Sequence, residues 1–245
     1  MQRDLVESVN KFGSKWAINA EKWKPDKEEF EFYVNQVQPD EQARIKKFRF
    51  EIDRKRALCG RLLIRHLVSL LFSIPSGEVK LGRTEKKKPI LLSPQLPRDR
   101  GELFEFNISH HGEWVVLVWS HTSVVGVDVM DYSKPRGSKS VESFFDTMKS
   151  SFTDDEWLTI KAEDEEEKRL KEFYRHWSLK ESYIKAIGLG LGFELRRASF
   201  FYPDAKSKLY AQVSGIVKSC PIKETHLLSV ICCDLCIQVK IDGVL

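Results

Sequence analysis

Apolar residues in the first half of the chain recur mainly at the three- and four-residue spacing of helices. The clearest case is 51–72, where apolar side chains repeat at helical steps and Pro75 and Gly77 follow, which predicts the end of the helix. Shorter helices are predicted over 26–37 and 39–48, each with a proline at its start. This half of the chain is therefore expected to be rich in helix.

Segments with the pattern of β-strands flank these helices. An aromatic-rich segment at 15–23 and a short segment at 78–81 are predicted strands, and 114–120 and 123–130 form two more, separated by a short turn. Apolar side chains occur on both faces of the last strand, which predicts a central position in a sheet. Asp128 lies on this strand, so we expect its carboxylate to be enclosed.

The second half of the chain shows the same mixture of periodicities. A helix is predicted over 141–151, a capping box from Thr153 to Glu156 opens another, and a charge-dense run begins a long helix over 161–187. Residues from 194 onward are predicted to form two or three strands. Helices beside strands that could pair in antiparallel sheets, in both halves, indicate an α+β protein.

Composition narrows the class of protein. The chain has 245 residues, 42% of them hydrophobic and 31% charged, a mixture that can bury a core and that argues against extensive disorder. No apolar run approaches the roughly 18 residues of a membrane-spanning helix. Residues 1–13 are polar and lack the apolar segment of a secretory signal. We therefore expect a cytoplasmic, cytosolic protein that does not act on membranes.

The cysteine pattern favours reduced thiols. The chain has five cysteines, and Cys233 and Cys236 have the CxxC spacing of some zinc and redox sites. The segment around them reads as one strand, in which an odd separation puts the two side chains on opposite faces. The sequence offers no second CxxC or matching histidine pair to complete a zinc site. Buried thiols in a reducing compartment are the better interpretation.

Charge indicates a small anionic ligand rather than nucleic acid. Lys and Arg total 40 against 36 Asp and Glu, a net charge of +4, which is too small to indicate nucleic-acid binding by itself. The basic side chains that could bind an anion are confined to one short loop, which suits a small polyanion; the alternative is an ordinary solvated surface. The loop comprises Arg83, Thr84, Glu85, Lys86, Lys87 and Lys88.

A polar segment before the strand at 114–120 is a second candidate for anion binding. It offers backbone amides, a hydroxyl and an imidazole, and consists of Asn107, Ile108, Ser109 and His110. His110 could contact a phosphate, or it could be a histidine without a role. Adjacency of Ser109 and His110 does not make them a nucleophile–base pair, because neighbours in sequence define no geometry.

The long helix carries the most informative pair of charged residues. Glu181 falls on the apolar stripe of this helix, and Lys185 lies four residues further on. A carboxylate on a buried face is costly unless a cation neutralises it. If Glu181 and the enclosed Asp128 converged, they would suit Mg²⁺, which takes one or two protein carboxylates. The alternative is a common i,i+4 pair between Glu181 and Lys185, with Asp128 capping a loop.

Several linked motifs resemble the phosphopantetheinyl transferases of the surfactin-synthetase-activating type, and most of all the animal branch named for aminoadipate-semialdehyde dehydrogenase. The resemblance covers nearly the whole chain in the same order. The motifs are Asn-Ile-Ser-His at 107–110, Val-Gly-Val-Asp-Val at 125–129, Trp-Ser-Leu-Lys-Glu-Ser-Tyr-Ile-Lys-Ala at 177–186 with Gly-Leu-Gly-Leu after it, and the segments 43–48 and 83–89.

The resemblance implies a fold and an activity. The fold would be two similar α/β subdomains, 1–122 and 123–245, in a pseudo-two-fold arrangement with antiparallel sheets flanked by helices. The activity would be that of a holo-acyl-carrier-protein synthase, in which 4'-phosphopantetheine passes from coenzyme A to a serine of an apo acyl or peptidyl carrier protein and adenosine 3',5'-bisphosphate is released. Mg²⁺ would be the cofactor, and the nucleophile would belong to the partner.

The resemblance also implies roles for individual residues. Asp128 and Glu181 would be the metal ligands, Lys185 would meet the pyrophosphate, and Glu181 would serve as general base, directly or through a metal-bound water. The adenosine and 3'-phosphate would be bound by residues of the two candidate anion-binding segments and by one arginine of the helix predicted over 39–48. These are Arg44, Arg83, Thr84, Glu85, Lys86, Lys87, Lys88, Asn107, Ile108, Ser109 and His110.

One position departs from the pattern of many bacterial members. They have a second acidic residue two positions after the strand aspartate, where this chain has Met130. A water would take that coordination position, as in the animal branch, because the neighbouring Asp131 is one residue out of phase along the strand.

Two other functions use the same residues. One is a Mg²⁺-dependent phosphodiesterase acting on nucleotides or coenzyme A, and the other is a non-catalytic module that binds coenzyme A or a carrier protein. For the transferase we expect a monomer whose partners are carrier domains of the fatty acid synthase or aminoadipate-semialdehyde dehydrogenase type, with no nucleic-acid or membrane partner. A carrier partner is expected to be acidic, which suits the small excess of Lys and Arg.

Overall fold

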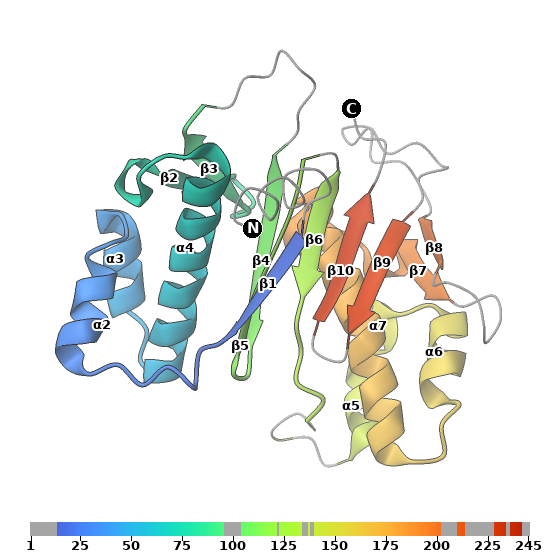
Figure 1. The fold of residues 1–245 in the computed structure, drawn as a ribbon. Helices are drawn as coiled ribbons and strands as arrows, with labels where there is room; N and C mark the ends of the chain where they lie inside the picture. Colours follow the sequence, from blue (N-terminus) through green and yellow to red (C-terminus); the bar gives the residue numbers. More distant parts are fainter. Residues whose placement is uncertain are drawn as a thin grey trace. The chain divides into compact units, whose positions relative to one another are not determined.

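A computed structural model of the chain divides into two compact units, Met1–Ser123 and Val124–Leu245. Each unit contains helices and antiparallel strands, so the α+β class predicted from the sequence is confirmed (Figure 1). In the described ranges, no helix has the length and apolar character needed to cross a bilayer. The predicted absence of a secretory signal concerns residues 1–13, which lie outside the described residues. The structure describes residues 14–95, 104–121, 123–133, 137, 140–201, 210–213, 228–233 and 236–241.

The N-terminal unit combines a long helix with a three-stranded antiparallel sheet. Its helices are α2 (Lys27–Val34), α3 (Pro39–Lys46) and α4 (Glu51–Phe72), with the 3₁₀ turn η1 (Ser76–Glu78). Its strands are β1 (Ser14–Asn19), β2 (Lys80–Arg83), β3 (Pro89–Ser93), β4 (Glu105–His111) and β5 (Trp114–Ser120). The sheet order is β1-β5-β4, and β2 and β3 form a separate hairpin.

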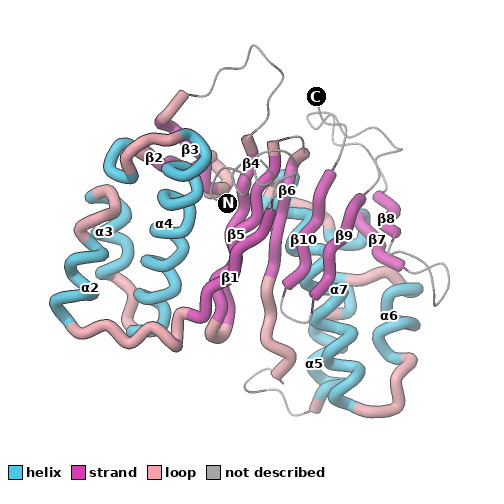
Figure 2. The backbone as a smooth tube through the Cα atoms, viewed as in Figure 1, coloured by secondary structure: helices cyan, strands magenta, loops and turns pink. Residues whose placement is uncertain are grey.

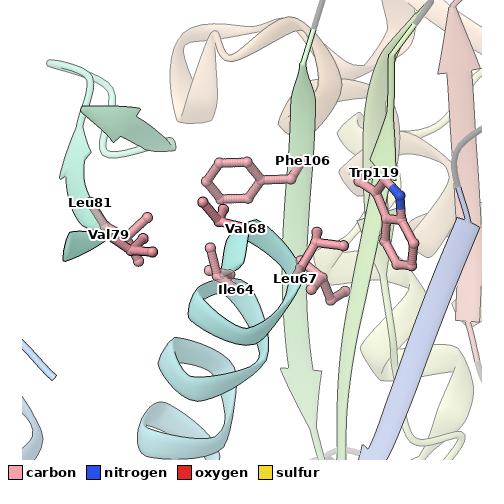
Figure 3. Close-up of a cluster of buried hydrophobic side chains, with 8 residues drawn as sticks. Ile64, Leu67, Val68, Val79, Leu81, Phe106 and Trp119 are labelled. Atoms are coloured by element: carbon pink, nitrogen blue, oxygen red, sulfur yellow. The ribbon is translucent and has the colours of Figure 1, made fainter. Parts of the chain in front are cut away.

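The core of this unit lies where α4 meets the strands. Ile64, Leu67 and Val68 repeat at three- and four-residue steps, so they share one face of the helix, and all three are fully buried. In Figure 3, Val68 lies beside Phe106 of β4 and Ile64 lies on the side of Leu81, whereas Leu67 lies on the side of Trp119. Burying each side chain of this size contributes roughly 1.5–3 kcal/mol. The helix, hairpin and sheet are therefore held together by one apolar cluster.

The C-terminal unit has corresponding parts. Its helices are α5 (Val141–Thr147), α6 (Asp154–Lys161) and α7 (Glu166–Ile187), with the 3₁₀ turns η2 (Lys149–Ser151), η3 (Gly190–Gly192) and η4 (Leu195–Arg197). Its strands are β6 (Val124–Asp128), β7 (Ala198–Phe201), β8 (Tyr210–Val213), β9 (Leu228–Cys233) and β10 (Cys236–Ile241). The sheet order is β6-β10-β9, and β7 pairs with β8 (Figure 2). Among the described residues, each unit thus has one three-stranded sheet, one two-stranded sheet and one helix of 22 residues.

The predicted capping box is confirmed. Thr153 precedes α6, its hydroxyl accepts a hydrogen bond from the backbone N of Glu156 at 3.3 Å, and the Glu156 carboxylate accepts one from the Thr153 backbone N at 2.8 Å. Because α6 runs to Lys161, the long helix begins at Glu166 rather than at 161.

Two predictions about strands are wrong. Cys233 and Cys236 do not share one strand: Cys233 ends β9, Cys236 begins β10, and the two residues are paired across the hairpin. β6 is not a central strand either, since within the described residues it pairs only with β10. Asp128 is nevertheless buried, with 4% of its surface exposed, and α7 packs against its strand.

Candidate functional site

A glycine brings β6 and α7 into backbone contact in the C-terminal unit. A Cβ placed on Gly126 would lie 1.9 Å from the carbonyl oxygen of Ser182 and 2.6 Å from the backbone N of Ala186. Any side chain at this position would therefore push the helix away from the strand. Glu181 and Lys185 each precede one of these two contact residues on α7.

Asp128 and Lys185 meet beside this contact. Gly126 and Asp128 are two residues apart on β6 and so lie on the same face of the strand. Oδ1 of Asp128 accepts a hydrogen bond from Nζ of Lys185 at 2.6 Å. The lysine is partly exposed whereas the aspartate is buried, so one end of the pair is open to solvent.

Glu181 belongs to the same group of charges. Burial raises the pKa of its carboxyl above the usual value; the positive charge of Lys185 lowers that pKa, and the negative charge of Asp128 raises it. The two carboxylates are therefore close enough to repel each other. We call Asp128, Glu181 and Lys185 the β6–α7 site; the structure brings these three predicted residues together.

The donor set of the β6–α7 site fits Mg²⁺. Two carboxylates that repel each other, one of them buried, are a suitable pair of oxygen ligands for a hard divalent cation. The described residues hold no group of three histidine, cysteine, aspartate or glutamate side chains that could bind a metal. Met130 packs against an apolar cluster, and the Asp131 carboxylate accepts hydrogen bonds from the backbone N and hydroxyl of Ser133. Protein ligation by two carboxylates is the arrangement that these residues support.

A buried ion pair fixes the position of α7. Lys180 and Glu156 have fully buried side chains, and Nζ of Lys180 lies 2.8 Å from Oε2 of Glu156. Nζ also donates to the carbonyl oxygens of Leu195 and Ala198, while Oε1 of Glu156 accepts from the backbone N of Phe200. The pair therefore links α6, α7 and β7. Because Lys180 immediately precedes Glu181, this link holds α7 in place next to the β6–α7 site. Sequence reasoning did not predict this ion pair, because the two residues lie on different helices.

A second group of charges lies in the N-terminal unit. A pocket of about 320 Å³ is formed by α3, α4, β2 and β4, and we call it the arginine pocket. Four predicted residues line it: Arg44 on α3, Arg83 on β2, and Ile108 and His110 on β4. Its lining residues are Asp40, Glu41, Arg44, Ile45, Phe48, Arg56, Ala57, Gly60, Arg61, Leu81, Gly82, Arg83, Ile108 and His110.

The alternation of β4 divides the predicted Asn-Ile-Ser-His segment. Ile108 and His110 line the pocket, whereas Asn107 and Ser109 are buried and are not among its lining residues. Successive side chains of a strand point to opposite faces, which explains this division. α4 approaches the strand closely because Gly60 has no side chain: a Cβ there would lie 2.9 Å from Cδ1 of Ile108.

The basic tract forms the turn of a hairpin, a loop as predicted, but the strand that follows it, β3, was not predicted. Backbone and side chain of Thr84 bond to Lys88, and Lys87 has a φ of 67°, the left-handed conformation that closes the turn. Glu85, Lys86 and Lys87 are exposed at this turn and do not line the arginine pocket. Nζ of Lys88 lies 2.6 Å from the Glu105 carboxylate, so this lysine ties the hairpin to β4.

The arginine pocket is rich in positive charge. The pKa of Arg83 is lowered to about 10, first by burial and then by the positive charges of Arg61 and Arg44. Three guanidinium groups therefore lie within electrostatic range of one another, an arrangement that an anion would stabilise. Glu41 and Arg61 were not predicted as site residues. The one available signal was Gly60, since a glycine inside a helix often marks a close approach.

Two family models match the chain, one within each of its two compact units. The family model described as 4'-phosphopantetheinyl transferase, N-terminal, matches residues 21–122. The model described as the 4'-phosphopantetheinyl transferase superfamily matches residues 124–235.

The chain is similar to three named proteins. It is 46% identical over 189 residues to a phosphopantetheinyl transferase of Thraustochytrium, covering 76% of this chain and 64% of that one. It is 44% identical over 199 residues to the human L-aminoadipate-semialdehyde dehydrogenase-phosphopantetheinyl transferase, covering 80% and 62%. It is 30% identical over 168 residues to the 4'-phosphopantetheinyl transferase Sfp of Bacillus subtilis, covering 69% and 67%. The chain thus spans less than two thirds of the length of the first two relatives.

Proposed function

Because the chain belongs to the 4'-phosphopantetheinyl transferase superfamily, we propose that it transfers 4'-phosphopantetheine from coenzyme A to a serine of a carrier protein. One structural observation carries this proposal: Asp128, Glu181 and Lys185 meet where β6 and α7 touch. A diphosphate needs cations beside it, and an incoming hydroxyl needs a base. This group of side chains can supply both.

Each residue of the β6–α7 site has a role in the proposed reaction. The serine oxygen of the carrier attacks the pyrophosphate phosphorus that bears the pantetheine, and its proton passes to the Glu181 carboxylate. The bond from that phosphorus to the bridging oxygen breaks, and adenosine 3',5'-bisphosphate leaves with the bridging electrons. Lys185 stabilises the negative charge that develops on the leaving phosphate.

Asp128 and Glu181 are the proposed ligands of Mg²⁺. When bound, the ion would neutralise negative charge on the pyrophosphate. Asp128 also orients Lys185 through the 2.6 Å hydrogen bond, which keeps the ammonium group beside the carboxylates. The side chain of Met130 offers no oxygen ligand, so water would supply the remaining ligands of a bound ion.

The arginine pocket is the proposed site for the adenosine 3'-phosphate end of coenzyme A. Arg44, Arg83 and His110 supply positive charge and hydrogen-bond donors for a phosphate. Apolar neighbours such as Phe48 and Ile108 offer a surface for the planar base. The remaining predicted residues, Thr84, Glu85, Lys86, Lys87, Lys88, Asn107 and Ser109, would act by shaping the hairpin and β4 or by contacts outside this pocket.

The proposed partners are acyl or peptidyl carrier domains, including those of fatty acid synthase and aminoadipate-semialdehyde dehydrogenase type. The human relative is named for the second of these proteins. The proposed form is a monomer acting in the cytosol. The buried free thiol of Cys59, whose pKa burial raises to about 11, is compatible with that reducing compartment.

The decisive experiment incubates the protein with coenzyme A, Mg²⁺ and an apo carrier protein. Mass spectrometry of the carrier should show the addition of one phosphopantetheine, lost when Mg²⁺ is chelated. Release of free phosphopantetheine without carrier modification would instead indicate a phosphodiesterase. Binding of coenzyme A with neither product would indicate a non-catalytic module. Either of the last two results overturns the transferase.

A further inference from the structure

One arginine of the arginine pocket is held in place by a carboxylate behind it. Nε of Arg61 lies 3.2 Å from Oε1 of Glu41. Among the described residues, Glu41 is the only acidic group in an ion pair with this guanidinium. The pairing engages Nε and leaves the two terminal nitrogens of Arg61 available to a ligand in the pocket that this residue lines.

Glu41 is itself fixed from behind. Its side chain is buried, and Oε2 lies 3.7 Å from a terminal nitrogen of the buried Arg65. Arg65 donates hydrogen bonds to the carbonyl oxygens of Ser76 and Val79 and to the side chain of Gln38. Arg65 is therefore fixed to the segment before β2. Arg65 in turn contacts Glu41, and Glu41 contacts Arg61.

The Gln38 side chain also sets the distance between α3 and β2. Its Oε1 accepts from the backbone N of Leu81 at 2.9 Å, and its Nε2 donates to the carbonyl oxygen of the same residue at 2.9 Å. Leu81 lies two residues before Arg83. The same polar network thus orients both Arg61 and the strand that carries Arg83.

The charges in the pocket do not balance without a ligand. The positive charge of Arg44 lowers the pKa of Arg61, and those of Arg61 and Arg44 lower the pKa of Arg83; two carboxylates, Asp40 and Glu41, line the same pocket. Arg56, the other lining arginine, is already paired with a carboxylate outside the lining, Asp53, at 3.4 Å. Burial raises the pKa of Glu41 and lowers that of Arg61, so desolvation outweighs their mutual attraction. A buried ion pair often adds little to stability, so a role in binding accounts better for this one.

We propose that Arg61, positioned by Glu41, binds the 3'-phosphate of the donor and makes the pocket selective for coenzyme A over 3'-dephospho-coenzyme A, an inference that rests on the proposed function. A terminal phosphate monoester carries close to two negative charges and presents oxygens that match the fork of a guanidinium. Arg44, Arg83 and His110 would hold the same group from the other walls of the pocket. Glu41 is a positioning residue, because it acts through Arg61.

The test measures calorimetric binding of coenzyme A and of 3'-dephospho-coenzyme A to the full chain. Arg61→Gln should weaken coenzyme A binding at least about tenfold, the scale of one lost charge-assisted hydrogen bond, and should change binding of the other donor less than about twofold. Glu41→Gln should reduce the preference several-fold and raise KM for coenzyme A with kcat unchanged. Lys46→Gln, which removes a charge from the same helix α3 but pairs with Glu31 outside the pocket, should keep the wild-type preference.

Equal weakening of both donors, or an unchanged preference in Arg61→Gln, overturns the inference. If that variant does not fold, Arg61→Lys decides: it keeps the charge but loses the fork, so a reduced preference supports the inference and a wild-type preference overturns it. Wild-type protein that modifies a carrier yet binds both donors equally would sink this inference alone. Wild-type protein that prefers coenzyme A but modifies no carrier would sink the proposed transfer alone.

Discussion

Nζ of Lys185 lies 2.6 Å from Oδ1 of Asp128, although 57 residues separate the two in sequence. The contact exists because Gly126 admits the backbone of α7 against β6. Glu181, one turn before Lys185, then shares the electrostatic environment of both residues. A base, a buried carboxylate and a cation are thereby gathered on two rigid elements, which is the arrangement that the proposed chemistry needs.

The first prediction concerns the two carboxylates. Asp128→Asn and Glu181→Gln should each lower kcat for carrier modification by at least about a hundredfold, the usual scale for losing a general base or a charge in the reacting centre. Neither should shift the unfolding midpoint by more than about 4 °C, roughly 1 kcal/mol for a chain of this length. Initial rates and thermal melts measure the two effects separately.

The matched control for this pair is Asp131→Asn. Asp131 is also a carboxylate close to β6, but its oxygens accept hydrogen bonds from Ser133. This variant should keep a rate within about threefold of wild type, because substitutions at exposed positions away from the reacting groups have small effects. Near-normal rates for both Asp128→Asn and Glu181→Gln would refute the roles assigned to the β6–α7 site.

The second prediction tests the contact that builds the site. Gly126→Ala places a Cβ against the Ser182 carbonyl, so α7 must shift, and overpacking of this kind costs at least about 1–3 kcal/mol. Carrier modification should fall more than stability alone would explain, because Glu181 and Lys185 move with the helix. Urea unfolding and single-turnover rates provide the comparison. Gly192→Ala, at a glycine with no atom within 4 Å of the added Cβ, should be nearly silent, and equal effects of the two changes would contradict the explanation.

The sequence pattern pointed to the individual residues of the β6–α7 site, but it could not show that they lie close together in the fold. Glu181 interrupts an apolar stripe and Asp128 sits in an apolar strand, and both signals are local. Their convergence depends on Gly126 packing against α7 across more than fifty intervening residues, and no periodicity encodes such a long-range contact. The family resemblance supplied the pairing of residues that the local pattern could not.

The arginine pocket shows where local reasoning fails. Arg61 and Glu41 occupy positions that read as polar faces of α4 and α3, and only the packing of those helices with β2 and β4 turns them inward. The β9–β10 hairpin was missed for a similar reason. Only Asp234 interrupts the apolar run around Cys233 and Cys236, and one polar residue is too weak a signal for a boundary between two strands.

The third prediction concerns the buried pair behind α7. Lys180→Met leaves the Glu156 carboxylate buried without its cation and should cost about 3–5 kcal/mol in the free energy of unfolding. Adding Glu156→Gln should recover at least about 1 kcal/mol of that loss, since the charge that needed a partner is gone. Lys168→Met, which removes an exposed pair with Glu165, should cost less than about 1 kcal/mol. A double variant as unstable as the sum of its single variants would show that the two residues are not coupled.

The fourth prediction concerns the pH dependence contributed by Glu41. Burial raises its folded-state pKa above the usual value of a glutamate, and Arg61 and Arg65 only partly oppose that rise. Between the unfolded and folded pKa values the folded chain binds more protons, so the stability contributed by this group is greatest at low pH and is lost as pH rises through the folded pKa. Glu41→Gln removes the titration, and each pH unit between the two pKa values corresponds to about 1.4 kcal/mol. Urea unfolding of both proteins from pH 4.5 to pH 8 should therefore show wild type losing stability relative to Glu41→Gln as pH rises. A relative gain would mean that attraction to Arg61 outweighs burial, and the pair would then be a stabilising one.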